Sequence, residues 1–270
     1  EFGMEWFQID AGWAKGDGDW QWDPTRFPHG GKWMAERIKE KGFKAGLWMS
    51  ALNANPDSQL VKDHPSWVAP KVEFAAKVGV AKGYALLDLA NPEVQGFIKD
   101  TATTVRKDWG FDWLKVDFAY WDLLAQGVYD PTLTREEAYK KGMGIVREAL
   151  GSDAFLLVVA IMGLNYGVAD ANRLTIDNMP VWERDPHFPA TESLVQPWQG
   201  LKPVMRAVAR RYYLHNRVWL NHPDLIFFRS NPNDPTWPRL TLDESTAFSS
   251  FVGLSGGIVK LGDKLVDLKP

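Results

Sequence analysis

The sequence predicts an α/β fold, specifically a (β/α)8 barrel that forms one domain over residues 1–270. Short apolar segments alternate with amphipathic helical segments, which is the pattern of a parallel sheet covered by helices. No glycine-rich phosphate-binding loop follows any expected strand, which disfavours the alternative of an open, doubly wound sheet. Three expected strands instead end at an aspartate, as is typical of the catalytic mouth of a barrel.

In the first half of the chain, apolar segments predict strands at residues 6–9, 44–49 and 113–116. The segment 84–87 is a further strand or an ordered loop. A helix is expected over residues 32–41, because Gly42 is a typical residue for ending one. A second helix is expected from Pro92 to about Lys107, with Asn91 as its N-terminal cap.

In the second half, Thr134 and Glu137 have the spacing of a capping box and predict the start of a helix. The continuous apolar run 155–160 is expected in a strand that is covered on both faces. Further strands are expected at 173–176, 225–228 and 258–260, and further helices over 202–214 and from 243 to about 253. Together these give about seven barrel strands. We therefore expect the chain to be a piece of a longer protein, with the first strand and helix upstream.

Composition excludes several classes of protein. The net charge is −3 and no long basic run occurs, which argues against nucleic-acid and membrane-surface binding. There are no cysteines, so disulfides and cysteine-bound metals are excluded. No apolar run reaches the roughly 20 residues needed to cross a bilayer. We expect no cofactor and no metal; compartment and oligomeric state are not readable from these features.

Asp10, Asp117 and Asp177 each follow an expected strand. Lys115 lies two residues before Asp117 and therefore shares its face of the strand, where its charge favours an ionised carboxylate. Arg173 stands four residues before Asp177 in the same way. Two carboxylates are what glycoside hydrolysis requires, one as nucleophile and one as general acid and base. Helix caps, solvated loop charges and ordinary ion pairs are the alternatives for these residues.

Several motifs, in order along the chain, resemble those of glycoside hydrolase family 36, which contains bacterial α-galactosidases. They are IDAGW (9–13), RFPHG (26–30), GLW (46–48), NPDS (55–58), HPSW (64–67), LDL with NPEV (87–94), LKVD (114–117), RLTID (173–177), WLNHPD (219–224) and LSGG (254–257). The matches extend from residue 6 to about 263.

The resemblance implies a (β/α)8 barrel, an α-galactoside oligosaccharide substrate and a double-displacement mechanism that retains configuration. It assigns Asp117 as nucleophile and Asp177 as general acid and base. The substrate-binding residues that it implies are Asp10, Trp13, Trp48, Lys115, Arg173 and Asp224. For Trp13 and Trp48 the alternative is core packing, and for Asp224 it is a structural ion pair.

The chain departs from the family pattern at positions that bear on which sugar is bound. Ala11 replaces a substrate-binding aspartate of many relatives, residues 49–52 replace an acidic segment, and His222 replaces an aspartate. The glycine-rich loop is replaced around residues 161–167. An α-N-acetylgalactosaminidase, a galactosyltransferase or an inactive carbohydrate-binding barrel are therefore alternative functions. We expect the pocket around residues 160–164 to decide among the sugars.

Two further patterns indicate metal sites only weakly. Asp17 and Asp19 faintly resemble a calcium-binding loop, but their spacing is incomplete, so an active-site loop is the preferred interpretation. The five histidines lack zinc-ligand spacing and are expected to be solvated or capping residues.

Overall fold

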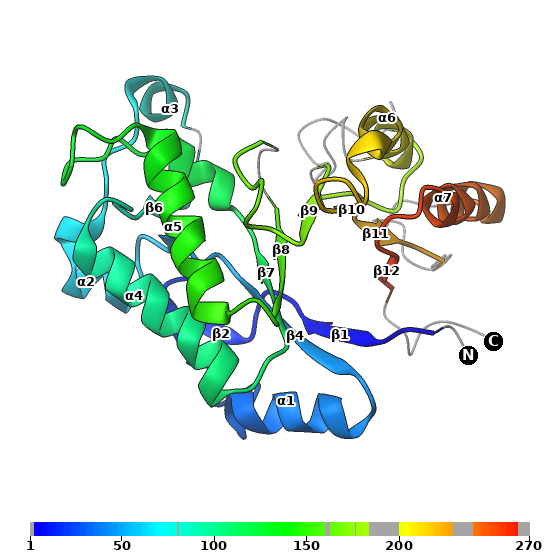
Figure 1. The fold of residues 1–270 in the computed structure, drawn as a ribbon, viewed down its shortest axis with the longest axis horizontal. Helices are drawn as coiled ribbons and strands as arrows, with labels where there is room; N and C mark the ends of the chain where they lie inside the picture. The colour runs from blue at the N-terminus through cyan, green and yellow to red at the C-terminus, as the bar shows by residue number, and fades with distance from the viewer. Residues whose placement is uncertain are drawn as a thin grey trace. The chain divides into compact units, whose positions relative to one another are not determined.

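The chain forms two compact units, residues Glu1–Asp170 and Ala171–Pro270 (Figure 1). The computed structural model describes residues 3–79, 81–159, 163–175, 177–183, 200–228 and 240–263. Within these ranges, no helix combines the length and the apolar composition needed to cross a membrane.

The first unit is built on a parallel sheet in the order β1 (Trp6–Ile9), β4 (Lys44–Met49), β7 (Trp113–Val116) and β8 (Phe155–Val158). Each neighbouring pair is parallel. The strands β4, β7 and β8 are buried almost throughout, because helices and loops cover both faces. A Cβ atom at Gly46 would lie 1.9 Å from the Trp113 indole, so this glycine is what allows the ring to lie across β4.

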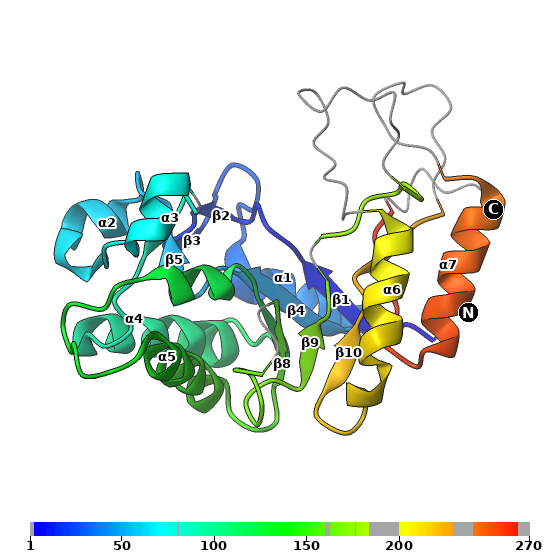
Figure 2. The same ribbon diagram turned by 90° about the horizontal axis from the view of Figure 1, so that it is seen from above.

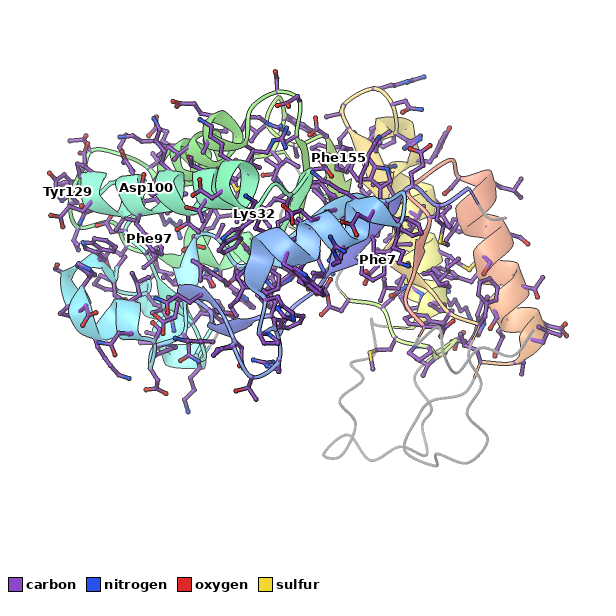
Figure 3. The ribbon with its side chains drawn as sticks, turned by 90° about the horizontal axis from the view of Figure 1, so that it is seen from below. Phe7, Lys32, Phe97, Asp100, Tyr129 and Phe155 are labelled. Carbon is purple, nitrogen blue, oxygen red and sulfur yellow. The ribbon has the colours of Figure 1, made fainter. Side chains whose placement is uncertain are left out.

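Helices connect these strands. The helix α1 (Gly30–Glu40) precedes β4, α4 (Pro92–Thr103) precedes β7, and α5 (Arg135–Leu150) precedes β8. The helix α4 ends in a π-helical turn (Thr104–Asp108), so the helical run extends to about the predicted residue. Helices α4 and α5 pack side by side (Figure 2). Exposed charged residues such as Lys32 of α1 and Asp100 of α4 lie on the outer faces (Figure 3).

Two predicted helix starts, at Asn91 and Thr134, are confirmed. The Asn91 side chain accepts a hydrogen bond from the Glu93 amide at 2.9 Å. At the start of α5, Thr134 and Glu137 form the expected capping box. These bonds satisfy amide groups that have no partner within the helix, which is why each helix begins at these residues.

Short elements lie beyond the parallel sheet. An antiparallel hairpin joins β2 (Ala14–Gly16) to β3 (Asp19–Trp22), and β5 (Asn53–Ala54) pairs with β6 (Ala85–Leu86) in the antiparallel sense. The segment 84–87 is therefore a short strand outside the parallel sheet. The remaining helices are α2 (Gln59–Asp63), α3 (Glu73–Val78) and the 3-10 turns Pro65–Trp67 and Ala119–Leu124.

The second unit has two pairs of short parallel strands. The strand β9 (Ala171–Arg173) pairs with β10 (Leu220–His222), and β11 (Leu225–Ile226) pairs with β12 (Lys260–Leu261). Two helices accompany them, α6 (Leu201–Arg211), followed by a 3-10 turn (Tyr212–Leu214), and α7 (Leu242–Leu254). The alternation of parallel strands and helices confirms the α/β class of the prediction.

Four strands differ from their expected bounds. The strand β8 ends at Val158, β11 ends at Ile226, β12 is shifted to Lys260–Leu261, and the strand before Asp177 is displaced. The expected strand 173–176 ends at Arg173, although the Leu174 amide still bonds the His222 carbonyl at 3.0 Å. Arg173 then donates from Nε to the Thr175 carbonyl at 3.0 Å. Asp177 consequently lies four residues beyond the end of β9.

Candidate active site

Asp10, Lys115 and Asp117 come together at the carboxyl-terminal edge of the parallel sheet in the first unit. Asp10 directly follows β1, Lys115 lies within β7, and Asp117 directly follows β7. The Asp117 amide donates to the Met49 carbonyl at 2.8 Å, so the residue is anchored to the end of the neighbouring strand β4. Parallel strands end at one edge, and this brings residues distant in sequence into one cluster.

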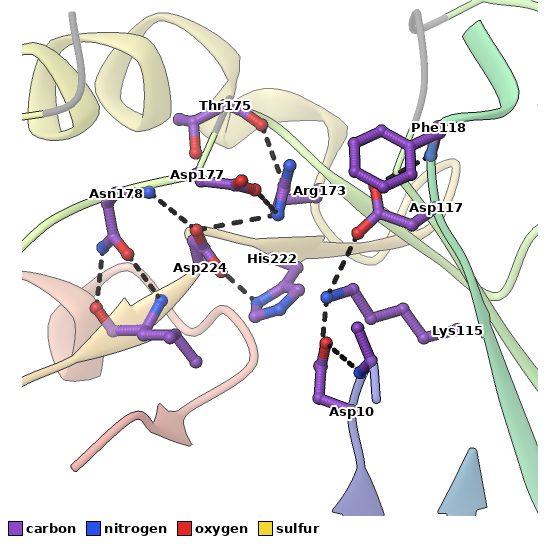
Figure 4. A network of polar contacts seen from close by, with 12 residues as sticks. Asp10, Lys115, Asp117, Phe118, Arg173, Thr175, Asp177, Asn178, His222 and Asp224 are labelled. Atoms are coloured by element: carbon purple, nitrogen blue, oxygen red, sulfur yellow. Dashed lines mark hydrogen bonds and ion pairs between the residues drawn. The ribbon is translucent and has the colours of Figure 1, made fainter. Parts of the chain in front are cut away.

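Asp117 is held by donors on both carboxylate oxygens (Figure 4). Its Oδ2 accepts a hydrogen bond from Trp48 Nε1 at 3.0 Å and lies 3.3 Å from Lys115 Nζ. Its Oδ1 accepts from the Phe118 amide at 2.8 Å. The residue is 5% exposed. A buried carboxylate with this set of donors is fixed in position and has its negative charge stabilised.

Lys115 connects Asp117 to Asp10. Its Nζ lies 3.2 Å from Asp10 Oδ2, and the lysine side chain is 8% exposed. The Asp10 side chain is 49% exposed, and it also contacts Gln8 and the Ala11 amide. Asp10 is therefore the carboxylate of this cluster that a ligand can reach from solvent.

A further carboxylate, Asp17, lies in the turn between β2 and β3. Burial raises the pKa of Asp17, an interaction with the Ser50 hydroxyl lowers it, and the negative charge of Asp117 raises it. Asp19 has a structural role instead, because its carboxylate accepts from the Gln59 and Leu60 amides at 2.8 and 2.9 Å at the start of α2. Among the described residues, no group of three acidic, histidine or cysteine side chains is placed to hold a metal ion.

Asp122 is a buried acid that the sequence did not indicate. It lies in the 3-10 turn after Asp117, is 3% exposed, and accepts from Asn53 Nδ2 at 3.3 Å. Burial raises the pKa of Asp122 well above its usual value, because the charged form loses its hydration. The only sequence signal is its place five residues after Asp117, which is too general to predict burial.

In the second unit, Arg173 lies among acidic residues (Figure 4). Its Nη1 is 2.5 Å from Asp177 Oδ1 and 3.7 Å from Asp224 Oδ2. The arginine side chain is 5% exposed, whereas the Asp177 side chain is 61% exposed. The predicted pairing of Arg173 with Asp177 is present. The Asp177 side chain is exposed to solvent, while the arginine side chain that it pairs with is buried.

Asp224 is buried. It adopts φ of 75°, and its Oδ2 accepts from the Asn178 amide at 2.8 Å. Its own amide donates to His222 Nδ1 at 3.3 Å. This burial and the ion pair with Arg173 favour the structural alternative for Asp224.

The two tryptophans differ in surroundings. Trp13 is 1% exposed and packs against Trp20, Trp22 and Trp109 with ring centroids 4.8 to 5.8 Å apart. Its Nε1 donates to the Trp48 carbonyl at 2.7 Å. Trp13 therefore fits the core-packing alternative, whereas Trp48 positions Asp117. Some predicted features lie outside the described residues. They are residues 160–162, which belong to the expected sugar-selecting pocket and in part to the replaced loop, and His187.

Comparisons with known proteins agree with these observations. An α-galactosidase from Thermus thermophilus, solved in complex with p-nitrophenyl α-D-galactopyranoside, is 29% identical, with a TM-score of 0.80 over 100% of this chain and 53% of that one. The α-galactosidase AgaB from Geobacillus stearothermophilus is 17% identical with a TM-score of 0.64, over 99% of this chain and 35% of that one, a likeness of fold alone.

Sequence relatives match a shorter part. An Escherichia coli α-galactosidase is 30% identical over 132 residues, 45% of this chain and 17% of that protein. An A type blood α-D-galactosamine galactosaminidase from Flavonifractor plautii is 27% identical over 129 residues, 44% of this chain and 12% of that protein. The chain thus spans less than a fifth of these relatives and about half of the Thermus protein. The melibiase family model matches residues 1–147, more than half of the 270 residues, and the chain therefore belongs to the melibiase family.

Proposed function

We propose that this chain carries the active site of a retaining α-galactosidase, which removes terminal α-linked galactose from oligosaccharides. The observation that supports this most directly is the environment of Asp117, a buried carboxylate at the end of a parallel strand with donors on both oxygens. Such a carboxylate is held in one orientation, as a nucleophile must be. Membership of the melibiase family supplies the sugar class.

In the proposed mechanism, Asp117 attacks the anomeric carbon while Asp177 gives its proton to the departing glycosidic oxygen. A covalent galactosyl ester then forms on Asp117. Asp177, now ionised, takes a proton from water, and the resulting hydroxide displaces Asp117 and leaves galactose with its original configuration. The exposure of Asp177 supports its role, because this residue must exchange protons with water and substrate.

The other residues hold the substrate or the carboxylates. The exposed Asp10 accepts hydrogen bonds from sugar hydroxyl groups, Lys115 fixes Asp10 and Asp117 relative to each other, and Arg173 orients Asp177. Trp48 donates to Asp117 and keeps its carboxylate in one orientation. We also propose that residues 1–270 belong to one (β/α)8 barrel domain, which the parallel strands linked by helices support.

Replacement of Asp117 by alanine in the complete protein tests the mechanism. We expect kcat to fall about 10⁴-fold or more, as for loss of a covalent nucleophile. Azide should then restore turnover of an activated galactoside by entering the vacant space, and the product should be the β-galactosyl azide because attack comes from the nucleophile's face. Normal activity of Asp117→Ala, or formation of α-galactosyl azide, would contradict the assignment.

A panel of nitrophenyl glycosides tests the sugar. We expect the wild-type protein to prefer the α-galactoside to the α-N-acetylgalactosaminide. The opposite preference would replace α-galactosidase by α-N-acetylgalactosaminidase and leave the proposed chemistry unchanged, whereas binding without turnover of either sugar would reject hydrolysis altogether.

A further inference from the structure

The residue that follows the proposed nucleophile has a strained backbone. Phe118 adopts a φ of 55°, in the left-handed region that bulky residues rarely occupy. In this conformation its amide donates to Asp117 Oδ1 at 2.8 Å (Figure 4). Strain of this kind persists where the surrounding structure enforces it. The orientation of the Asp117 carboxylate therefore depends on the contacts that keep Phe118 in the left-handed conformation.

Asn53 joins Phe118 to a different segment of the chain. Its Nδ2 donates to the Phe118 carbonyl at 3.2 Å, and this carbonyl also accepts from the Trp121 amide at 3.0 Å within the 3-10 turn. Asn53 belongs to β5, where its backbone is paired with Leu86 of β6. Because the backbone of Asn53 is fixed by this pairing, its side chain holds the Phe118 carbonyl in one place.

Asp122 orients the side chain of Asn53. Its Oδ2 accepts from the same Nδ2 at 3.3 Å. Two acceptors, the Phe118 carbonyl and Asp122 Oδ2, thus face one end of the Asn53 amide, and this requires the nitrogen to lie there rather than the oxygen. The contacts form a continuous path from Asp122 through Asn53 and Phe118 to Asp117.

We propose that Asn53 is a positioning residue for Asp117, and that Asp122 keeps Asn53 in the orientation that this role requires. Asn53 holds the Phe118 carbonyl, which maintains the left-handed turn, and the Phe118 amide then keeps the Asp117 carboxylate in one orientation. Asn53 is 1% exposed and Asp122 is 3% exposed, so both are too buried to contact a sugar. This inference rests on the proposed α-galactosidase function.

Replacement of Asn53 by leucine removes the donor and keeps the approximate size of the side chain. In the complete protein, we expect kcat for nitrophenyl α-galactoside to fall about 10- to 100-fold, as for loss of one hydrogen bond to a charged group. The Kd of galactose, measured by calorimetry, should stay within about twofold of wild type, because no sugar contact is removed. Asp122→Leu should lower kcat in the same way, whereas Asp122→Asn keeps the acceptor and should retain kcat.

A second background tests whether the effect passes through Phe118. Glycine adopts the left-handed conformation without steric cost, so a turn with Phe118→Gly does not need Asn53 to maintain it. In that background the loss of kcat caused by Asn53→Leu should shrink to under about threefold. A loss of equal size in both backgrounds would show that the effect does not pass through the strained turn, and would overturn the proposal.

Two further variants separate positioning from a loss of stability. Ser58 is a buried N-terminal cap of α2 that accepts from the Val61 amide at 3.3 Å. Ser58→Ala should lower the melting temperature and leave kcat unchanged. Asn53→Leu combined with Asp122→Leu replaces both polar partners by apolar side chains and should regain melting temperature relative to Asn53→Leu alone, but not kcat. Recovery of kcat together with stability would show a purely structural role.

The results distinguish this inference from the proposed function. Wild-type protein that does not hydrolyse α-galactosides would overturn the proposed function, and the positioning role with it. An active wild type with unchanged kcat in Asn53→Leu would overturn the positioning role alone. A fall in kcat with unchanged galactose affinity, retained activity in Asp122→Asn and a much smaller loss in the glycine background is the result that supports the inference.

Discussion

Asp117 in the first unit and Asp177 in the second each follow a strand that has a parallel partner within its own unit, yet their surroundings contrast. Asp117 is buried, adjoins its strand directly and has donors on both oxygens. Asp177 stands four residues beyond its strand, is largely exposed and is tied to Arg173. A fixed carboxylate suits attack on carbon, whereas an exposed one suits repeated proton exchange. The contrast in environment is thus what separates the two proposed roles.

The largest expected effect concerns the leaving group, which Asp177 is proposed to protonate. In Asp177→Ala, we expect kcat/KM for melibiose to fall on the order of 10²–10⁴-fold, because the departing oxygen loses its proton donor. For dinitrophenyl α-galactoside the fall in kcat/KM should be much smaller, since that leaving group needs no proton. Asp117→Asn should instead lose activity on both substrates. Equal losses on both substrates in Asp177→Ala would assign the proton transfer to another residue.

Stability measurements sharpen the comparison between the two clusters. Lys115→Met leaves the buried Asp117 without its ion pair, and we expect unfolding free energy to fall by roughly 3 kcal/mol in urea denaturation. Arg173→Met should be destabilising on the same scale, because Asp224 is buried as well. Lys99→Met, which breaks an exposed pair with Glu148, is the control and should cost under about 1 kcal/mol. A loss for Lys115→Met as small as the control would show that solvent reaches Asp117 freely.

A smaller effect concerns Asp122, the buried acid near Asp117. Its folded pKa lies above the unfolded value of 3.8 because of burial, so the folded state binds more protons and stability falls as pH rises through that window. Asp122→Asn is neutral at every pH and should melt a few degrees above wild type at pH 7, with a smaller gain or none below pH 4.

Asp130 is expected to show the opposite dependence of stability on pH. Hydrogen bonds from Thr132 lower the pKa of Asp130, so its carboxylate adds stability that is present above pH 3.8 and is lost as the pH falls through the lower folded value. Asp130→Asn should therefore lose a little stability at pH 7. A gain for Asp122→Asn that did not depend on pH would mean that ionisation is not its cause.

Elements that depend on residues close in the sequence were predicted well, whereas those that depend on distant residues were not. The strands 6–9, 44–49 and 113–116 and the caps at Asn91 and Thr134 were predicted with the observed bounds or partners, because apolar runs and capping bonds involve near neighbours. The partner of β6 was not predicted, since it lies about 30 residues away in β5 and only folding selects it.

The sequence by itself determined the α/β class, the family and the pairing of Lys115 with Asp117, because period-two alternation and ordered motifs are local properties. Only the tertiary structure decided that Trp13 is a core residue, that Asp122 is buried next to Asn53, and that Lys115 also reaches Asp10. Burial and contact between residues 69 or 105 positions apart depend on how the strands assemble, and no short stretch of sequence contains that information.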